Sequence, residues 1–518
     1  MPVLSLMITM KISPRISSKL FFEIFIAIIT GAGIFFFLKM DEVLLMGPQG
    51  IHFMRQTDSL SFAAMYYNEG FDFFHPALFN MKNIDARAAC EFPILYYITS
   101  LIYLVTDQNF TVLKILNYLV SLSGVFCIYK MSMIILRDRL FSVLIALVLF
   151  TSTVFNYYSL NYLPDTGAFG FIMIGWYFFF RYYFNNKQNS LYTAFVFFTL
   201  GSLIKVTYLI NPLSVFFLYL IMPFIKKGRN RNTFDYKVLL SGLITVGTVA
   251  AWNLYMISYN NTYESTSFNT TAMPLWNISS EEIAIVWDHF TNYWYRSYFA
   301  RPVFYLLFVS AAFQILFFKK SDRFLSLLTL ILFAGNLAFF ILFYSQFKDH
   351  DYYFIAFYPL IIFVLLNGFK TFKNLDIKSI YSTSLKIITF FIIALGINYS
   401  GQKLQARYDA AMDDYSGTGL TIQHNNLKLD SIGISQDAKF IVAPDLTQNG
   451  GLLMLNRKGW NIERPEDINP DRIGYFRDQG ADFLLLASED DRLRETGHEC
   501  GELVFRGEGL SIFKLVKK

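Results

Sequence analysis

Long apolar runs recur along the first 400 residues and limit the available folds more than any other feature of the sequence. A helix needs about 20 apolar residues to cross the hydrocarbon core of a bilayer. With 54% hydrophobic and 16% charged residues, the chain is far from a soluble average. The sequence therefore predicts a mainly α-helical, polytopic membrane bundle. About 11 runs suit a span: 20–39, 112–133, 140–157, 166–184, 190–208, 210–225, 237–258, 302–318, 324–345, 352–369 and 383–399.

Short basic turns between these runs predict the orientation of the bundle, because Lys and Arg near helix ends favour the cytoplasmic side. All of the turns fall inside if the shorter run 92–106 lies on the membrane surface as an amphipathic helix instead of crossing. The first run, which follows Lys11, Arg15 and Lys19, is longer than a signal-peptide core and is expected to be an uncleaved anchor. The turns are Lys130/Arg137/Arg139, Arg181/Lys187, Lys226/Lys227/Arg229/Arg231, Lys319/Lys320/Arg323 and Lys370/Lys373/Lys378.

This topology puts the N-terminus inside and the C-terminus outside, which is the periplasm for a bacterial inner membrane. The outer side receives the loop 41–111 with its juxtamembrane helices, the turn 161–165, the loop 259–300, the turn 346–351 and the tail. The tail, 401–518, is polar at its start and then holds short β-like runs separated by turn residues. We expect a small α/β domain outside the membrane, with strands near 439–443, 451–455, 482–486, 503–506 and 510–516.

Three acids are candidate catalytic residues on the outer side. Asp58 stands before Ser59–Asn68, which reads as a helix, so it is either an N-cap or a general base near Arg55. Glu91 either caps a helix before Pro93 or contacts a metal ion or a substrate. Asp165 either caps the next span or supports catalysis at its mouth.

Basic side chains on the same side are candidate ligands for a phosphate group. Lys205 stands late in the run 190–208, where it either snorkels or binds a phosphate. His350 lies among carboxylates and either is solvated or binds phosphate or a metal ion, and His289 is a weaker candidate of this kind. Acids and cations gathered at one membrane surface suit transfer from a phosphate-linked donor.

Other functions are less compatible with the sequence. The scattered Cys90, Cys127 and Cys500 match neither a metal-ligand spacing nor a disulfide framework. The net charge of +5 is small, and the basic residues lie in short turns between apolar runs. Nucleic acid is therefore not an expected partner. A transporter or flippase of lipid-linked sugars remains an alternative, although no internal repeat is visible. A non-catalytic membrane assembly protein or receptor is another, with the outer domain as its binding part.

Four motifs resemble a known group, the GT-C glycosyltransferases, in the branch of protein O-mannosyltransferases and the lipid A aminoarabinose transferase. The resemblance covers about 20–400 and implies a GT-C-like transmembrane catalytic domain over 1–400. The expected periplasmic α/β domain over 401–518 follows it. It implies inverting transfer of a sugar from a polyprenyl-phosphate donor to a hydroxyl acceptor on a protein, lipid A or a glycan. The motifs are Arg55-Gln56-Thr57-Asp58, Glu91-Phe92-Pro93, Pro164-Asp165 and His350-Asp351-Tyr352-Tyr353.

The resemblance also implies roles for single residues, namely Asp58 as the catalytic acid/base and Asp165 as its support. In the aminoarabinose branch, the acid matching Glu91 binds a metal ion and a neighbouring Lys contacts the donor phosphate. That neighbour is Phe92 here, so Arg55, Lys205 and His350 become the candidate phosphate ligands, with Glu91 and His289 as candidates for a divalent metal ion or substrate. The mannosyltransferase Asp-Glu pair is also missing, because Ser59 follows Asp58, and the acceptor is therefore not implied.

Overall fold

The computed structural model describes residues 18–225, 235–268, 272–375, 379–409 and 413–516. The expected basic residues Lys11 and Arg15, the turn Lys226/Lys227/Arg229/Arg231 and Lys378 lie outside these ranges.

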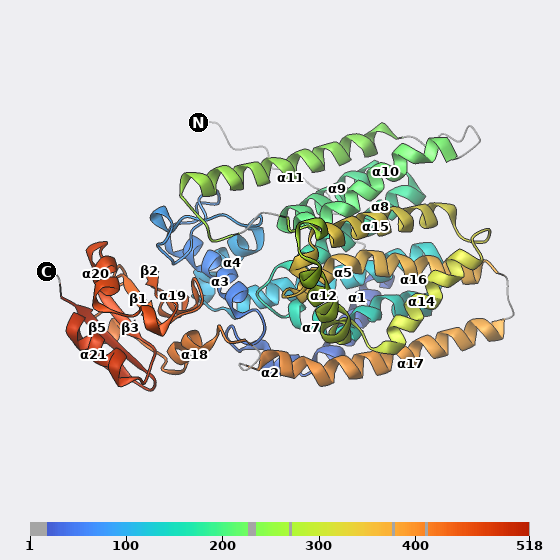
Figure 1. The fold of residues 1–518 in the computed structure, drawn as a ribbon. Helices are drawn as coiled ribbons and strands as arrows, with labels where there is room; N and C mark the ends of the chain where they lie inside the picture. The colour runs from blue at the N-terminus through green and yellow to red at the C-terminus, as the bar shows by residue number, and fades with distance from the viewer. Residues whose placement is uncertain (1–17, 226–234, 269–271, 376–378, 410–412, 517–518) are drawn as a thin grey trace, which may run out of the picture.

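Long helices lie side by side and form the bundle of an integral, multi-pass membrane protein (Figure 1). Most of the apolar runs are single helices, and 140–157 is the broken helix pair α6 (Arg139–Leu147) and α7 (Thr153–Ser159). The single helices are α1 (Ser18–Phe37), α5 (Thr111–Leu136), α8 (Asp165–Asn185), α9 (Gln188–Ile204), α10 (Ile210–Ile225), α11 (Tyr236–Thr262), α14 (Arg301–Leu316), α15 (Arg323–Leu342), α16 (Tyr358–Lys373) and α17 (Ser379–Leu404).

The number of helices that qualify as spans is smaller than the expected number of about 11. Within the described residues, 7 helices are long and apolar enough, or up to 9 if each of two bent pairs is one span. The pair α6 and α7 is bent by 80°, and the segment Ser280–Tyr298 meets α14 at 97°. The two expected spans outside this count are α8 and α9. Trp176 and several Tyr residues make α8 less apolar, and α9 has only 17 residues.

Two helices of the loop 41–111 lie at the end of the bundle nearest the C-terminus of the chain (Figure 1). They are α3 (Phe53–Asn68) and α4 (Ile94–Thr106). The 13 residues of α4 are too few for a span, as expected for the run 92–106. Because α3 begins at Phe53 and not at Ser59, Asp58 lies inside the helix, and the N-cap interpretation of Asp58 is wrong.

The C-terminal unit (residues 417–516) is a five-stranded sheet covered by short helices, drawn in orange and red in Figure 1. The strand order is β2-β1-β3-β5-β4, with β1 parallel to β2 and β3, and β5 antiparallel to β3 and β4. The strands are β1 (Phe440–Ala443), β2 (Gly459–Asn461), β3 (Phe483–Leu486), β4 (Gly501–Gly507) and β5 (Leu510–Leu515). The helices are α18 (Gly417–His424), α19 (Gly450–Leu455), α20 (Pro470–Asp478) and α21 (Asp491–Cys500).

The expected strand at 451–455 is wrong, because these residues belong to α19. A short continuous apolar run such as Leu452-Leu453-Met454-Leu455 has no alternation, so it cannot be told from a buried helix by pattern. The three-residue strand β2 was not expected, and the other four strands lie where the sequence predicted them.

Both faces of β1 are buried, as in a central strand of an α/β sheet. Phe440 and Val442 belong to the large core that continues into the bundle, whereas Ile441 and Ala443 face a second core together with Trp460. The C-terminal unit is therefore packed onto the rest of the chain through one face of its sheet.

A segment of the loop 41–111 also closes the edge of the sheet at β2. The Gly459 N–H donates to the Phe79 carbonyl at 3.1 Å, and the Met81 N–H donates to the Gly459 carbonyl at 2.7 Å. Only glycine fits at this strand position, since a Cβ on Gly459 would lie 1.8 Å from the Phe440 carbonyl oxygen. Loop and sheet thus share backbone hydrogen bonds.

Candidate functional site

Five of the seven candidate residues form a charged cluster at the end of the bundle that carries the C-terminal unit. The cluster is built by α3, by the segment before α4, by the first residue of α8 and by the residue that ends α9. Side-chain ion pairs connect its members in two groups. The members of the charged cluster are Arg55, Asp58, Glu91, Asp165 and Lys205.

Arg55 and Glu91 form the first ion pair. The Arg55 Nη2 atom lies 3.0 Å from Glu91 Oε1 and 3.3 Å from Oε2, and the Tyr96 hydroxyl donates to Oε1 at 2.5 Å. The Cys90 thiol donates to Oε2. Burial alone would raise the pKa of Glu91, but the charges of Arg55 and Lys205 outweigh it and lower the pKa to about 2. Glu91 is therefore a fixed anion that does not cap α4.

Asp58 is buried between α3 and the C-terminal unit. Its Oδ1 atom accepts a hydrogen bond from Asn449 Nδ2 at 2.8 Å, and its Oδ2 atom lies 3.6 Å from Arg55 Nη1. Burial raises the pKa of Asp58, while Arg55 and Asn449 act in the opposite direction. A carboxylate with a raised pKa is a stronger proton acceptor than an exposed one, which suits a general base.

Lys205 and Asp165 form the second ion pair. The Lys205 Nζ atom lies 3.2 Å from Asp165 Oδ1 and 5.2 Å from the centre of the Tyr352 ring. The Lys205 side chain is 19% exposed, so it is held in the site and does not snorkel into solvent. The second carboxylate oxygen of Asp165 is buried without a hydrogen-bond partner among the described residues.

The two candidate histidines differ in position. The His350 ring stacks on the His52 ring, with centroids 5.8 Å apart, and burial together with His52 lowers the pKa of His350 to about 3. The His350 imidazole is therefore neutral and can offer a phosphate a hydrogen bond but no charge. His289 begins the π-helix His289–Trp294 and packs against Tyr293, and no contact of the described residues joins it to the charged cluster.

A further ion pair, which is fully buried and which the sequence did not predict, lies beside His350. Asp351 accepts from Arg407 at 2.5 Å, from the Tyr158 hydroxyl at 2.6 Å, and faces His52 Nε2 at 3.3 Å. Asp351 belongs to a motif already noted for His350, which could have drawn attention to it. Arg407 follows α17 in the tail that was expected to be extramembrane, so no local pattern singled it out.

The residues around Glu91 do not fit a metal site. The described part of the chain has no group of three or more His, Cys, Asp and Glu side chains that could hold a metal ion. Both Glu91 carboxylate oxygens already accept hydrogen bonds, from Arg55, Tyr96 and Cys90. A metal ion would have to displace these donors.

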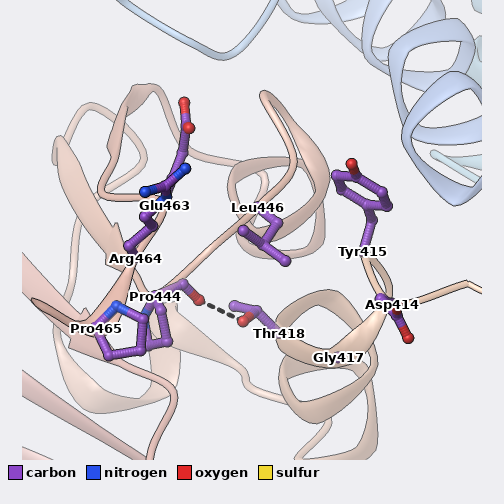
Figure 2. Close-up of a pocket in the computed structure, with 9 residues that line it drawn as sticks. All are labelled: Asp414, Tyr415, Gly417, Thr418, Pro444, Leu446, Glu463, Arg464 and Pro465. Carbon is purple, nitrogen blue, oxygen red and sulfur yellow. Dashed lines mark hydrogen bonds between the residues drawn. The ribbon is translucent and has the colours of Figure 1, made fainter.

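A cavity of about 220 Å³ opens at the start of the C-terminal unit (Figure 2). Figure 2 shows that it lies between the start of α18 and the loops that follow β1 and β2. It contains none of the candidate residues, but Leu446 in its wall belongs to the same loop as Asn449. The lining residues are Asp414, Tyr415, Gly417, Thr418, Pro444, Leu446, Glu463, Arg464 and Pro465.

Comparison with known proteins identifies a family match in the middle of the membrane bundle. The family model for dolichyl-phosphate-mannose-protein mannosyltransferases matches residues 90–252, which include Glu91, Asp165 and Lys205. No curated protein matches the sequence.

Solved structures are similar over nearly the whole chain. ArnT from Cupriavidus metallidurans bound to undecaprenyl phosphate has a TM-score of 0.61 at 10% identity, over 95% of this chain and 98% of that chain. The same protein in the apo state has a TM-score of 0.59 at 10% identity, over 96% and 99%. The oligosaccharyltransferase AglB from Archaeoglobus fulgidus, in complex with an inhibitory peptide and a dolichol-phosphate, has a TM-score of 0.52 at 10% identity, over 94% and 73%.

These similarities confirm the resemblance drawn from the sequence motifs. The matched fold extends through the bundle and the C-terminal sheet. Residues 90–252 thus match the mannosyltransferase family model, and the fold of nearly the whole chain is similar to that of ArnT and AglB, as the resemblance to GT-C glycosyltransferases implied.

Proposed function

We propose that this protein transfers a sugar from a polyprenyl-phosphate donor to a hydroxyl acceptor, with Asp58 as the general base. The observation that carries the proposal is the gathering of Asp58 with two half-buried cations, Arg55 and Lys205, in one cluster. Two similar proteins were solved with such lipids, ArnT with undecaprenyl phosphate and AglB with a dolichol-phosphate. We further propose that the cluster faces the periplasm across a bacterial inner membrane, as the basic turns of the sequence suggest.

The proposed reaction is a single displacement at the anomeric carbon. The acceptor oxygen forms a bond to this carbon, and the bond from the carbon to the phosphate oxygen breaks. Asp58 takes the proton of the acceptor hydroxyl, and the polyprenyl phosphate leaves with the electron pair of the broken bond. Because the attack comes from the side opposite the leaving group, the anomeric configuration inverts.

Arg55 and Lys205 stabilise the charge that develops on the departing phosphate. Each cation already has a carboxylate partner, Glu91 or Asp165, which fixes its side chain before the donor arrives. The neutral His350 adds a hydrogen bond to the phosphate, and Asp165 keeps Lys205 in place.

Purified protein given radiolabelled undecaprenyl-phosphate sugars and cell-envelope acceptors tests the proposal. Asp58→Asn should abolish sugar transfer, while binding of undecaprenyl phosphate persists because the Arg55 and Lys205 charges remain. Asp72→Asn is the matched control, since Asp72 is an exposed acid of the same loop whose ion pair among the described residues is with His75. Near-normal transfer by Asp58→Asn would exclude Asp58 as the base.

The two alternatives give different results in the same preparation. A flippase in proteoliposomes would move a fluorescent lipid-linked sugar between leaflets without forming a new glycosidic bond. An assembly protein would bind its partner through the C-terminal unit, and Asp58→Asn would have no effect.

A further inference from the structure

One hydrogen-bond donor to the Asp58 carboxylate comes from the C-terminal unit and not from the membrane bundle. Asn449 is the residue before α19, and its Nδ2 atom donates to Asp58 Oδ1 at 2.8 Å across a sequence separation of 391 residues. Both side chains are buried, with 0% exposure for Asn449 and 3% for Asp58. A buried hydrogen bond to a carboxylate is stronger and more directional than an exposed one.

The orientation of the Asn449 amide is fixed by its second contact. Its Oδ1 atom accepts from the backbone N–H of Asn80 at 3.2 Å, in the segment that closes the sheet edge. Since the amide oxygen must face this donor, the NH₂ group must face Asp58. The flipped amide would place an oxygen against the carboxylate and an NH₂ group against the backbone N–H.

The turn that carries Asn449 is itself rigid. Asp445 Oδ1 accepts from the Thr447 N–H at 2.9 Å and from its hydroxyl at 2.6 Å, and Asp445 Oδ2 accepts from the Gly451 N–H at 2.9 Å. The glycine at position 451 lets the turn close onto Asp445, because a Cβ there would lie 2.7 Å from Asp445 Oδ2. The turn follows the carboxyl end of β1, the edge at which open α/β sheets place ligand-binding groups.

We propose that Asn449 is a positioning residue for the base, so that the C-terminal unit completes the active site of the membrane bundle. This inference rests on the proposed function of Asp58. By holding Oδ1, Asn449 fixes the rotation of the carboxylate and leaves Oδ2 as the oxygen that takes the proton of the acceptor hydroxyl.

The hydrogen bond also affects the ionisation of Asp58. The charged groups that face Asp58 are Arg55 on α3, which favours the anion, and Glu91 before α4, which opposes it. The donor group of Asn449 favours the anion as well. Removal of this donor raises the pKa of Asp58, and since the base acts as the anion, the acidic limb of the rate profile moves to higher pH.

An infrared titration of the full-length protein in detergent measures this effect without any substrate. The carbonyl band of protonated Asp58 is assigned by its loss in Asp58→Asn. In Asn449→Ala, the titration midpoint of this band should rise by about 1–2 pH units, the range expected when a carboxylate loses one charge-assisted hydrogen bond. Asn449→Asp, which keeps an acceptor for the Asn80 N–H, should raise it further through like-charge repulsion.

Asn68→Ala is the matched control, because Asn68 donates to Asn456 of the C-terminal unit at 2.9 Å and does not contact Asp58. It should leave the midpoint unchanged. A midpoint that stays at the wild-type value in folded Asn449→Ala overturns the inference, and Asn449→Asp decides the question if Asn449→Ala does not fold.

Turnover separates this inference from the proposed function. If transfer survives in Asp58→Asn, the proposed function fails. If Asp58→Asn is inactive but the acidic limb of kcat in Asn449→Ala stays at its wild-type pH, only the positioning role of Asn449 fails.

Discussion

Two cations face three carboxylates in the charged cluster, and each carboxylate lies within 4 Å of a cation. A buried ion pair gives little net stability, but removal of one partner leaves an uncompensated charge. Arg55 lies between Asp58 and Glu91, and Lys205 holds Asp165. A substitution that removes one charge of a pair should therefore lower the stability of the protein more than a double substitution that removes both charges.

Lys205→Met should destabilise the protein by about 3 kcal/mol, because the buried Asp165 carboxylate loses the cation that pairs with it. Thermal unfolding in detergent, with circular dichroism as the readout, measures the loss. The double variant Lys205→Met/Asp165→Asn should recover most of it, since no unpaired charge remains. Additive losses in the double variant would show that the pair is not coupled.

Asp445 should make the stability of the protein depend on pH between about 4 and 6. Burial raises the pKa of Asp445 from 3.8 to about 6, although hydrogen bonds from Thr447 and Gly451 oppose the shift. An acid with a raised pKa stabilises the fold fully below its unfolded pKa, and this contribution disappears as the pH rises through its folded pKa. The shift of about 2 units corresponds to about 3 kcal/mol.

The unfolding free energy of the wild type, minus that of the non-titrating Asp445→Asn, isolates this contribution. The difference should fall between pH 4 and pH 6 and stay level above about pH 7. A difference that rises or remains flat over this interval would contradict the raised pKa of Asp445.

The core of the bundle depends on glycines that let α5, α8 and α9 approach closely. A Cβ on Gly170 of α8 would lie 2.4 Å from the Val120 carbonyl oxygen of α5, and a Cβ on Gly201 of α9 would lie 2.9 Å from the Ala168 carbonyl oxygen of α8. Backbone atoms cannot rotate away as side chains do. Small residues at such contacts are the usual means of helix packing in membranes.

Gly170→Ala should therefore destabilise the bundle by about 1–3 kcal/mol, through forced separation of α5 and α8. Gly247→Ala on α11 is the control, because no described atom beyond the backbone of α11 itself and the adjoining residues lies within 4 Å of its Cβ position. The control should leave the thermal midpoint unchanged or raise it slightly, since Ala favours a helix. Equal midpoints for the two variants would contradict the close approach of α5 and α8.

Sequence reasoning located the helices well because hydrophobic length is a property of each segment alone. The same reasoning put the start of the Asp58 helix six residues late, at Ser59 in place of Phe53. The segment Phe53–Thr57 mixes Arg55 and Gln56 with apolar residues, and these polar side chains turn toward Glu91 and the loop in the folded protein. A boundary set by tertiary contacts is not visible in local composition.

Some residues of the candidate site were likewise predictable from the sequence, and others were not. Acids and cations that share one end of the bundle were predictable, since the order of the spans fixes the side on which each residue emerges. The side chains that hold them were not, because Asn449 and Arg407 are distant in sequence from their partners Asp58 and Asp351. The polar turn that follows the expected strand 439–443 is a sequence signal that could have drawn attention to Asn449.

The C-terminal unit and the bundle form one body through contacts of several kinds. Two charged pairs at the surface, Lys82 with Glu463 and Lys458 with Glu69, join the same two parts as the buried contact between Asn449 and Asp58. The shared core continues through the same interface. The site is therefore an assembly of both parts of the molecule.

Carbodiimide treatment of native membranes tests this arrangement without a change of sequence. The reagent joins carboxylates and amines in contact, so Lys82 should become linked to Glu463, whose atoms lie 3.0 Å apart. Mass spectrometry of the digested protein identifies the linked peptides. Glu463→Gln should remove the link and Glu466→Gln should not, whereas absence of the link in the wild type would contradict the docking of the C-terminal unit.

The backbone pairing of Phe79 and Met81 with Gly459 limits how the C-terminal unit can be separated from the bundle or exchanged between proteins. An open strand edge invites pairing with other chains, so an excised C-terminal unit would self-associate through β2. A chimaera that imports this unit from a relative would need the matching loop segment from the same donor. Segment 79–81 and the C-terminal unit are consequently expected to be inherited together.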